Sequence, residues 1–477
     1  MNSRQSDLTT GPIMGHLFRL AVPTIGASFM QMTYNLTDML WLGRLGENAV
    51  ASVGAAGFYV WLGISVLLVT RIGAEVGVSQ ALGRKDAPQA MRFVRHALLW
   101  AIIITAVLAV VTYIFAPSFI RFFGISSVAV NTDGAAYLRI VSLAFIFSFV
   151  NPTFSGIYNG MGNSRLPFWY MAIGVGLNLV LDPLLIFGWK FVPNLGIEGA
   201  AWATFGSQMV VFVTFVYRFV IKEEMGKLHL RQFHFDRIIS KRIFALGIPV
   251  AAESALFAMF GMILARFVAR YGPVAIAVQS IGGQVEALSW MTASGFATAL
   301  GSFTGQNFGA GFWDRIRKGY RYTLFIGTCL ALPVSLIFWL FGADIYSLFF
   351  DQENSQYLGG VYLSILSVSQ LFMVYEITTR GAFNGVGRTI PPALIGIFFT
   401  GLRIPLAYGL MQIPNFGLFG IWWAISITSI FKGSISPLWF RRVLNHHDGE
   451  GETGFLGSRL IVLLPSRLRQ QWIIKKR

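Results

Sequence analysis

The sequence contains two similar halves, in which the same short motifs recur in the same order. The paired positions are Pro23 with Pro249, Gln80 with Gln306, and residues 159–160 with residues 384–385. The spacing is 226 residues for the first two pairs and 225 for the third. Chance does not keep register over this distance, and a solenoid has a much shorter period of about 20–50 residues. We therefore expect a duplicated domain.

Composition indicates what kind of domain was duplicated. Hydrophobic residues make up 55% of the chain, charged residues only 12%, and the mean hydropathy is +0.62. A soluble protein of ordinary composition carries about 25% charged residues. Apolar runs recur along the chain, each long enough to cross about 30 Å of hydrocarbon. The sequence therefore predicts an all-α membrane protein that crosses the bilayer many times.

Twelve transmembrane helices are expected, six in each half. The expected spans lie near residues 15–40, 50–80, 92–116, 133–160, 166–188, 198–220, 242–268, 275–306, 319–342, 356–385, 391–411 and 418–440. The corresponding organisation is an N-lobe at 1–221, a cytoplasmic connector at 222–241, a C-lobe at 242–442 and a basic tail at 443–477. An even number of spans per half predicts two lobes related by a pseudo-twofold axis along the membrane normal.

The distribution of positive charge predicts the orientation in the membrane. Basic residues gather after the second and eighth expected spans, in the connector and in the tail, as in Arg84, Lys85, Arg315, Arg317 and Lys476. Cytoplasmic loops are rich in Lys and Arg, so both termini are expected in the cytoplasm of a bacterial inner membrane. The formal charge of +16 is read as a topology signal. Because the basic residues lie in separate loops, no nucleic-acid partner is expected.

Other features limit the classes of activity. The single cysteine, Cys329, excludes an intrachain disulfide framework. The chain has no phosphate-binding loop of the GxxxxGK[ST] type, no paired-aspartate protease motif and no metal triad. We therefore expect no enzyme and no cofactor. Any work on a solute is expected to draw on an ion gradient or on passive equilibration.

Two carboxylates at membrane depth are the first candidates for a functional site. Asp38 follows Tyr34 by four residues, and Asp182 follows Asn178 by four residues. This spacing places each pair on one helix face. Thr204 is expected on the adjacent span at about the depth of Asp182. A carboxylate at the bilayer centre costs about 2.5–3.5 kcal/mol on insertion scales, so such residues are functional candidates.

The chemistry of these residues suits a small cation. Carboxylate, amide and hydroxyl oxygens form a hard cage that suits Na⁺, and two neighbouring carboxylates suit H⁺ equally well. The ligand set does not choose between these ions. A structural interpretation also remains, in which Asp38 bridges helices and Asp182 satisfies the turn broken by Pro183. The second half has Leu264 where the first has Asp38, so the site is expected in one lobe only.

A resemblance to a known family rests on seven stretches. They are VPTIGASFMQMTYNLTDMLWLGRLG at 22–46, GVSQALGRKD at 77–86, GMGNSRLP at 160–167, NLVLDP at 178–183, GIEGAAWAT at 196–204, IPVAAES at 248–254 and GQNFGAG at 305–311. With them, residues 10–442 resemble the multidrug and toxic compound extrusion (MATE) transporters of the MOP flippase superfamily, in particular the DinF-like prokaryotic branch. The resemblance implies a cation-binding site at Asp38, Asn178, Asp182 and Thr204, with Tyr34 nearby.

The second half carries its own carboxylates. The resemblance to the NorM branch of the family implies a C-lobe ion or substrate site that includes Glu253, while Glu376 is offset from the usual acidic position. Glu286 is a third candidate. For Glu286 and Glu376, the alternative is an ion pair with an arginine within the lobe, such as Arg266, Arg380 or Arg403. For Glu75 in the first half, an i, i+4 ion pair with Arg71 is expected.

The sequence therefore predicts a secondary active multidrug efflux transporter. The resemblance implies small cationic or amphipathic substrates, antiport against Na⁺ or H⁺ and alternating access in a lipid bilayer. The sequence does not give the oligomeric state, and a monomer is favoured. A flippase for a lipid-linked precursor, from the same superfamily, is the alternative function, and a channel is less consistent with a one-lobe ion site. For the tail at 445–477, two interpretations stay open: a basic amphipathic segment on the membrane surface, or a disordered tail.

Overall fold

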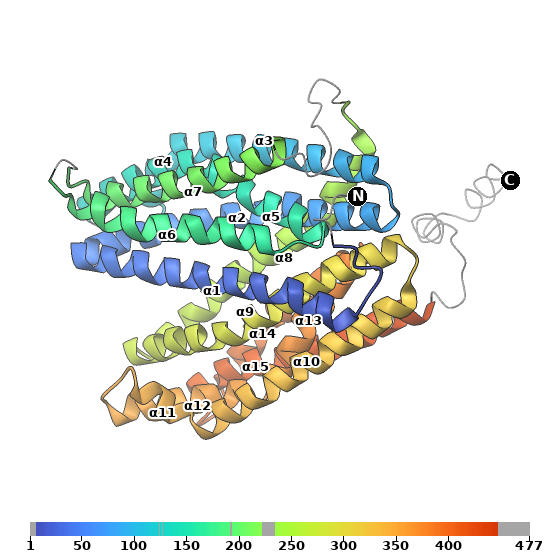
Figure 1. The fold of residues 1–477 in the computed structure, drawn as a ribbon. Helices are drawn as coiled ribbons and strands as arrows, with labels where there is room; N and C mark the ends of the chain where they lie inside the picture. The colour runs from blue at the N-terminus through green and yellow to red at the C-terminus, as the bar shows by residue number, and fades with distance from the viewer. Residues whose placement is uncertain (1–5, 124, 126, 191–192, 222–233, 447–477) are drawn as a thin grey trace, which may run out of the picture. The chain divides into compact units, whose positions relative to one another are not determined.

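Helices follow one another throughout the part of the chain that the structure, a computed structural model, describes, and no β-strand lies among them (Figure 1). The described residues are 6–123, 125, 127–190, 193–221 and 234–446. The helices of the first half are α1 (Ile13–Leu45), α2 (Glu47–Gly83), α3 (Ala87–Arg121), α4 (Val128–Ser148), α5 (Val150–Gly160), α6 (Arg165–Phe187) and α7 (Gly196–Ile221). The helices of the second half are α8 (Arg237–Ala269), α9 (Pro273–Gly309), α10 (Trp313–Leu340), α11 (Gly342–Ser347), α12 (Glu353–Ser367), α13 (Gln370–Gly385), α14 (Ile390–Leu410) and α15 (Gly417–His446).

The chain divides into two compact units, Met1–Pro437 and Leu438–Arg477. The first contains all helices up to the larger part of α15. Of the second, the structure describes the last turns of α15. The greater part of the expected connector, 222–233, and the tail from 447 onward lie outside the described residues.

The duplication read from the sequence is visible in the helix boundaries. Helix α9 begins and ends 226 residues after α2, so the two match residue for residue in extent. The α1 and α8 helices are each 33 residues long. The turns that follow them contain Gly46 and Gly272, with φ of 116° and 94°. Only glycine adopts such angles readily, because a Cβ atom would be strained there. The repeated glycines therefore repeat the same turn.

The twelve expected spans are accounted for. Ten segments of the described chain are long and apolar enough to cross a membrane, and the bent pair α12–α13 forms another. Helix α9 is the twelfth by its equivalence to α2. Its hydropathy is too low for it to be counted among those ten segments, because small and polar residues are frequent along it. These spans make the protein a multi-pass membrane protein, as the sequence predicted. The short α11 was not expected.

Two of the spans are interrupted, one in each half, and the interruption in the second half lies five to six residues earlier than the repeat would place it. Between α4 and α5 the interruption follows from Pro152, which has no N–H to donate to the carbonyl of Ser148. Between α12 and α13 the bend is 51°, and there the Oγ of Ser369 donates to the carbonyl of Leu366 at 3.0 Å. A serine hydroxyl that bonds to the preceding turn often bends a helix.

Two boundaries differ from those expected for the second half. Helix α8 begins at Arg237, before the predicted lobe boundary at 242, because Asp236 caps it. Its carboxylate accepts hydrogen bonds from the backbone N–H groups of Ile238 and Ile239, at 2.8 and 3.2 Å. Such a cap satisfies donors that the helix leaves free. At the other end, α15 continues to His446, beyond the expected boundary at 442.

The two halves contact each other through the first two helices of each. Helix α1 packs against α9, and its counterpart α8 packs against α2. These contacts are close. A Cβ atom added at Gly247 in α8 would lie 2.2 Å from the carbonyl oxygen of Val69 in α2. Likewise, a Cβ at Gly73 in α2 would lie 2.9 Å from the carbonyl oxygen of Ile243 in α8. The absence of side chains at these glycines allows the backbones to touch.

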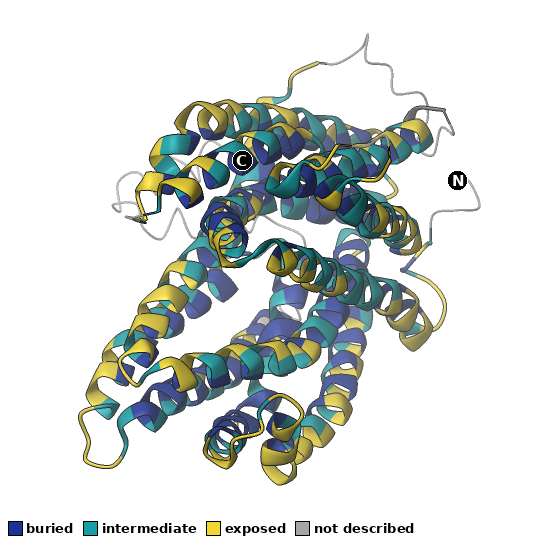
Figure 2. Cartoon of the chain, turned by 90° about the vertical axis from the view of Figure 1, so that its left-hand side faces the viewer, coloured by how far each residue is buried: buried dark blue, intermediate teal, exposed yellow. Residues whose placement is uncertain are grey.

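Toward the opposite end, the same helices have open surroundings. A Cβ added at Gly54 in α2, Gly261 in α8 or Gly283 in α9 would meet no atom within 4 Å. Figure 2 views the helices from this end, where the helices of the two halves lie apart. The contacts between the halves therefore concentrate at the end where α1 and α8 begin and where α2 and α9 end.

Candidate functional site

Helices α1 and α7 bring Tyr34 and Thr204 together. The hydroxyl groups of these two residues lie 2.9 Å apart, within hydrogen-bonding distance. Asp38 lies one turn further along α1, and its Oδ1 is buried without a hydrogen-bond partner. Two helices far apart in sequence thus supply adjacent oxygen atoms.

Helix α6 supplies the second carboxylate. Asn178 and Asp182 are 1% and 0% exposed, and the Nδ2 of Asn178 donates to the Oδ1 of Asp182 at 3.1 Å. Asp182 keeps its other oxygen, Oδ2, buried and without a partner. Pro183 follows directly and has no N–H, so the carbonyl of Leu179 lacks its usual helical donor. This turn of α6 is therefore rich in acceptors and short of donors.

The two carboxylates are close enough to interact electrostatically. Within the part of the chain that the structure describes, no Lys or Arg forms an ion pair within 4.0 Å of Asp38 or Asp182. Two acids, each with an unsatisfied buried oxygen, thus share one region of the N-lobe without a protein cation. A buried carboxylate without a partner is costly, and a bound cation or proton would remove that cost.

Tyr137 belongs to the same region, although the sequence did not point to it. It is 7% exposed, lies in α4, and interacts electrostatically with Asp38, Tyr34 and Asp182. A single tyrosine in an apolar helix carries no distinctive pattern, and its neighbours come from helices α1 and α6. Its membership in the region could not be inferred without the packing of α4.

The C-lobe carboxylates Glu253 and Glu376 have a different environment. The Nη1 of Arg380 lies 3.1 Å from the Oε1 of Glu253 and 4.0 Å from the Oε1 of Glu376. The Nζ of Lys432 lies 3.7 Å from the Oε2 of Glu376. Both carboxylates are 8% exposed. This is a buried network of alternating charge that the chain itself supplies from α8, α13 and α15.

Glu286, the third C-lobe candidate, lies beside this network. Its Oε1 accepts a hydrogen bond from the Nε2 of Gln370 at 3.3 Å. Arg403 interacts electrostatically with it, while the guanidinium group donates to Thr428 at 2.8 Å and Ser429 at 2.9 Å. Of the three arginines named from the sequence as alternative partners, Arg380 and Arg403 therefore lie near the C-lobe carboxylates. In the described chain, Arg266 forms no ion pair with them within 4.0 Å.

Lys432 was missed by the sequence reasoning. It is 7% exposed in α15 and pairs with Glu376. A lysine inside a membrane-spanning helix is itself a signal, because it is expensive there unless it is paired. That signal was present in the sequence, but its partner on α13 was not.

Arg71 interacts electrostatically with Glu75, but the two residues do not form the close ion pair that was expected. No contact within 4.0 Å joins their charged groups in the described chain, and the Oε1 of Glu75 instead accepts a hydrogen bond from Ser302 in α9 at 3.3 Å. Arg71 packs beside Gly156 of α5. The helical spacing allows the pair, but α2 packs against helices of both halves. Its side chains on successive turns therefore face different helices.

A family model identifies the chain more directly. The MatE model matches residues 23–184 and again residues 249–409. The two matches fall on the two halves and together cover more than half of the sequence. The chain belongs to the MatE family. MatE proteins are transporters, so the transport function predicted from the sequence is confirmed at this level.

Similar curated proteins support the assignment to the MatE family over nearly the whole length. A probable multidrug resistance protein NorM from Thermotoga maritima is 26% identical over 429 residues, which are 90% of this chain and 92% of that protein. A protein from Shewanella oneidensis named as an FAD transporter is 27% identical over 440 residues, which are 89% and 94% of the two chains.

Solved MatE-type structures share the fold of twelve helices in two lobes. A MATE structure in complex with MaD3S aligns with a TM-score of 0.88 at 24% identity, over 94% of this chain and 100% of that chain. A MOP superfamily transporter from Pyrococcus furiosus aligns with a TM-score of 0.87 at 25% identity over the same shares. The fold class predicted from the duplication is therefore confirmed.

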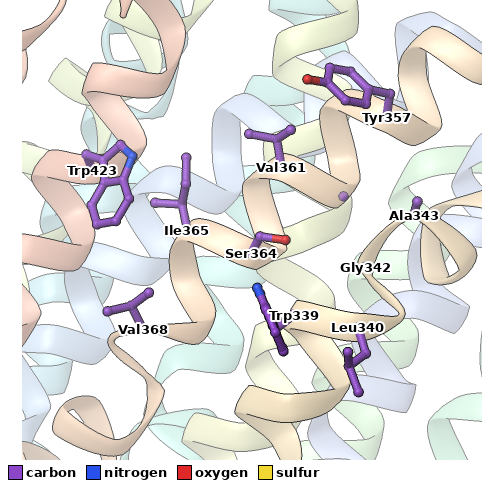
Figure 3. Close-up of a pocket in the computed structure, with 11 residues that line it drawn as sticks. Trp339, Leu340, Gly342, Ala343, Tyr357, Val361, Ser364, Ile365, Val368 and Trp423 are labelled. Atoms are coloured by element: carbon purple, nitrogen blue, oxygen red, sulfur yellow. The ribbon is translucent and has the colours of Figure 1, made fainter.

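An apolar cavity of about 500 Å³ in the C-lobe of this MatE protein is separate from the charged groups (Figure 3). It is lined by α10, α11, α12 and α15, with Trp339, Tyr357, Val361 and Trp423 among the lining residues. None of the eight candidate site residues lines it. The candidate site therefore remains the acidic region formed by α1, α4, α6 and α7, together with the C-lobe network.

Proposed function

We propose that the protein is a secondary active efflux transporter that exports organic cations and amphipathic compounds in exchange for Na⁺ or H⁺. The observation that carries this proposal is the acidic pair in the N-lobe. Asp38 and Asp182 each keep a buried oxygen without a partner, and no protein cation balances them in the described chain. A small cation that binds there supplies the missing charge.

The residues divide the work of cation binding. Asp38 and Asp182 provide the negative charge, Thr204 and Tyr34 provide hydroxyl oxygens, and Asn178 orients Asp182 through its hydrogen bond. Oxygen ligands of this kind suit a hard cation such as Na⁺, and the carboxylates can hold a proton instead. Of these residues, Asp38 and Tyr34 lie on α1, which also packs against the C-lobe helix α9.

The position of Asp38 and Tyr34 on α1 couples cation binding to the arrangement of the two lobes. Occupancy of the site changes the charge beside α1, and α1 contacts both lobes, so the cation favours one arrangement of the lobes over the other. By thermodynamic linkage, a substrate that favours the other arrangement weakens cation binding by the same factor. Exchange of substrate for cation follows from this reciprocity.

The orientation proposed for this cycle places both termini in the cytoplasm of a bacterial inner membrane. The basic residues Arg84, Lys85, Arg315 and Lys318 lie at the end of the molecule where α2 and α9 finish and where the halves are in contact. With that end in the cytoplasm, the arrangement described above is closed to the cytoplasm.

Efflux of ethidium from proteoliposomes tests the proposal. A Na⁺ gradient and a pH gradient are imposed separately on the wild type, on Asp38→Asn and on Asp133→Asn, a matched change at a carboxylate outside the site. We expect gradient-driven efflux in the wild type and Asp133→Asn, and its loss in Asp38→Asn. Full efflux by Asp38→Asn at equal abundance refutes the cation site.

The same assay separates other substrate classes. FAD is included as an anionic probe, because one relative is named as an FAD transporter. Movement of FAD without movement of ethidium refutes the assignment to organic cations. Movement of neither probe under either gradient, with folded protein, favours the lipid-linked precursor flippase instead.

A further inference from the structure

Two equivalent glutamines join the lobes at the closed end. The Nε2 of Gln80 in α2 donates to the carbonyl of Gly385 at 2.9 Å, and the Nε2 of Gln306 in α9 donates to the carbonyl of Gly160 at 3.1 Å. The two bonds are related by the internal repeat, and each crosses from one lobe to the other. Both glutamines are buried, at 1% and 3% exposure.

The lobes approach very closely around these bonds. A Cβ atom at Gly83 would lie 1.9 Å from the carbonyl oxygen of Gln306, and one at Gly309 would lie 2.1 Å from that of Gln80. No methyl group fits at either position. The end of α2 and the end of α9 therefore form a tight seam, which must separate before a solute passes at this end.

A segment before the first helix lies across this seam. We call residues 6–11 the strap; it runs beside the C-lobe before entering α1 (Figure 1). Leu8 in the strap is fully buried. Its N–H donates to the Oε1 of Gln306 at 3.0 Å, and its carbonyl accepts from the Nδ2 of Asn307 at 3.1 Å. On the N-lobe side, a Cβ at Gly162 would lie 2.8 Å from the carbonyl oxygen of Ser6.

Arg315 in α10 holds the strap against the C-lobe. Its Nη2 donates to the carbonyls of Leu8, Thr10 and Gly11, at 3.3, 3.3 and 3.1 Å. Its Nε donates to the Oδ1 of Asn307 at 3.1 Å. Only a planar guanidinium presents several donors in this fixed fork. The repeat places Gln89 at the equivalent position of the N-lobe, so the N-lobe has no arginine there.

We propose that Arg315 and Gln306 are positioning residues for transport, which hold the strap across the seam and thereby keep this end of the protein shut. The strap touches both lobes, and its buried Leu8 is bonded to the same glutamine that joins the lobes. Opening at this end therefore requires the strap to leave. The proposal rests on the proposed function only in assigning the opening to a transport cycle.

Thiol labelling tests whether the strap keeps the seam closed, and the assay needs no transport substrate. Ser79 is fully buried in the seam, where its Oγ would lie 2.1 Å from a Cβ at Gly305. In full-length protein carrying Cys329→Ser, the rate at which Ser79→Cys reacts with a water-soluble maleimide reports how often the seam opens. Addition of Arg315→Gln removes the hydrogen bonds of the guanidinium group and is expected to raise this rate roughly tenfold, as expected for loss of hydrogen bonds from a charged donor.

Two further variants distinguish the hydrogen bonds of Arg315 from its positive charge. Arg321→Gln, an exposed arginine on the same helix, is expected to leave the labelling rate unchanged. Arg315→Lys keeps the charge but not the fork, so an intermediate rate is expected. Equal labelling rates in Arg315→Gln and Arg321→Gln overturn the proposal.

A crosslink provides the opposite test. Thr10→Cys and Asp314→Cys place thiols on the strap and beside Arg315, and a cleavable bifunctional maleimide joins them in the Cys329→Ser background. Ethidium efflux is expected to stop and to return when the crosslinker is cleaved. Undiminished efflux in the crosslinked protein overturns the proposal that the strap must leave before this end opens. The protein could instead show labelling that responds to Arg315→Gln while it moves neither ethidium nor FAD. That outcome supports the role of the strap and refutes the proposed function.

Discussion

The two lobes descend from one repeated unit, yet they treat buried charge in opposite ways. In the N-lobe, Asp38 and Asp182 have no basic partner within 4.0 Å in the described chain, and each keeps an unsatisfied oxygen. In the C-lobe, three glutamates share a region with three basic residues. They are Glu253, Glu286 and Glu376, with Arg380, Arg403 and Lys432.

This difference separates a site whose carboxylates have no basic partner from a network whose carboxylates lie beside basic side chains of the chain itself. Buried charges are tolerated when they are paired and hydrogen-bonded. The C-lobe supplies the opposite charges from its own side chains, although the Oε2 of Glu253 has no hydrogen-bond partner. In the N-lobe, a bound cation or proton would supply the missing positive charge. Neutralising a carboxylate should therefore have opposite effects on stability in the two lobes.

The largest effect is expected from Glu376→Gln. This change leaves Lys432 without the carboxylate that lies 3.7 Å from it and leaves Arg380 with Glu253 alone. Removal of one member of a buried pair typically costs about 3–5 kcal/mol. Thermal unfolding in detergent should show a strong loss of stability. Glu353→Gln, the same change at an exposed position, is the control, and equal melting of the two variants would contradict a paired network.

The corresponding N-lobe change, Asp182→Asn, should not destabilise the protein. It removes one of two interacting carboxylates and with it their mutual repulsion, while Asn178 can still donate to the new amide oxygen. Gradient-driven efflux should nevertheless fall by roughly 5–150-fold, the range of typical coupling energies. Thermal unfolding and ethidium efflux measured on one preparation check both parts, and a large loss of stability would place Asp182 among structural residues.

A double variant tests whether the C-lobe network is a unit. Lys432→Met should destabilise the protein alone, but Lys432→Met combined with Glu376→Gln removes both members of the pair and should recover part of the loss. Residues in contact show coupling energies of about 0.5–3 kcal/mol. The cycle is measured by unfolding of the two single variants and the double variant. Additive effects would show that the two charges act independently.

The sequence predicted the fold well because its repeat is a constraint on every helix. The spacing that pairs Gln80 with Gln306 also relates the boundaries of α2 and α9, and apolar length marks most spans. Helix ends were less predictable. The start of α8 depends on a cap at Asp236, a local feature that hydropathy does not report.

The candidate site was predictable where its members share a helix. Tyr34 with Asp38, and Asn178 with Asp182, are linked by a spacing of four residues, which fixes a common face. Tyr137 and Lys432 depend on contacts between helices remote in sequence. The same reason accounts for Glu75, whose hydrogen-bond donor is Ser302 of the other lobe.

The smallest expected effect sharpens the N-lobe side of the comparison. Tyr34→Phe removes the 2.9 Å hydrogen bond to Thr204 and one hydroxyl oxygen, but keeps both carboxylates. A hydrogen bond contributes about 0.5–1.5 kcal/mol, so the cation concentration for half-maximal efflux should rise roughly 2–10-fold. Tyr59→Phe is the matched control, because it removes a bond of 2.8 Å to the carbonyl of Phe119 without involving the acidic pair. If both variants shift the cation dependence equally, the hydroxyl groups stabilise the N-lobe in general. If only Tyr34→Phe shifts it, the hydroxyl belongs to the cation site, and the N-lobe uses neutral oxygens where the C-lobe uses opposite charges.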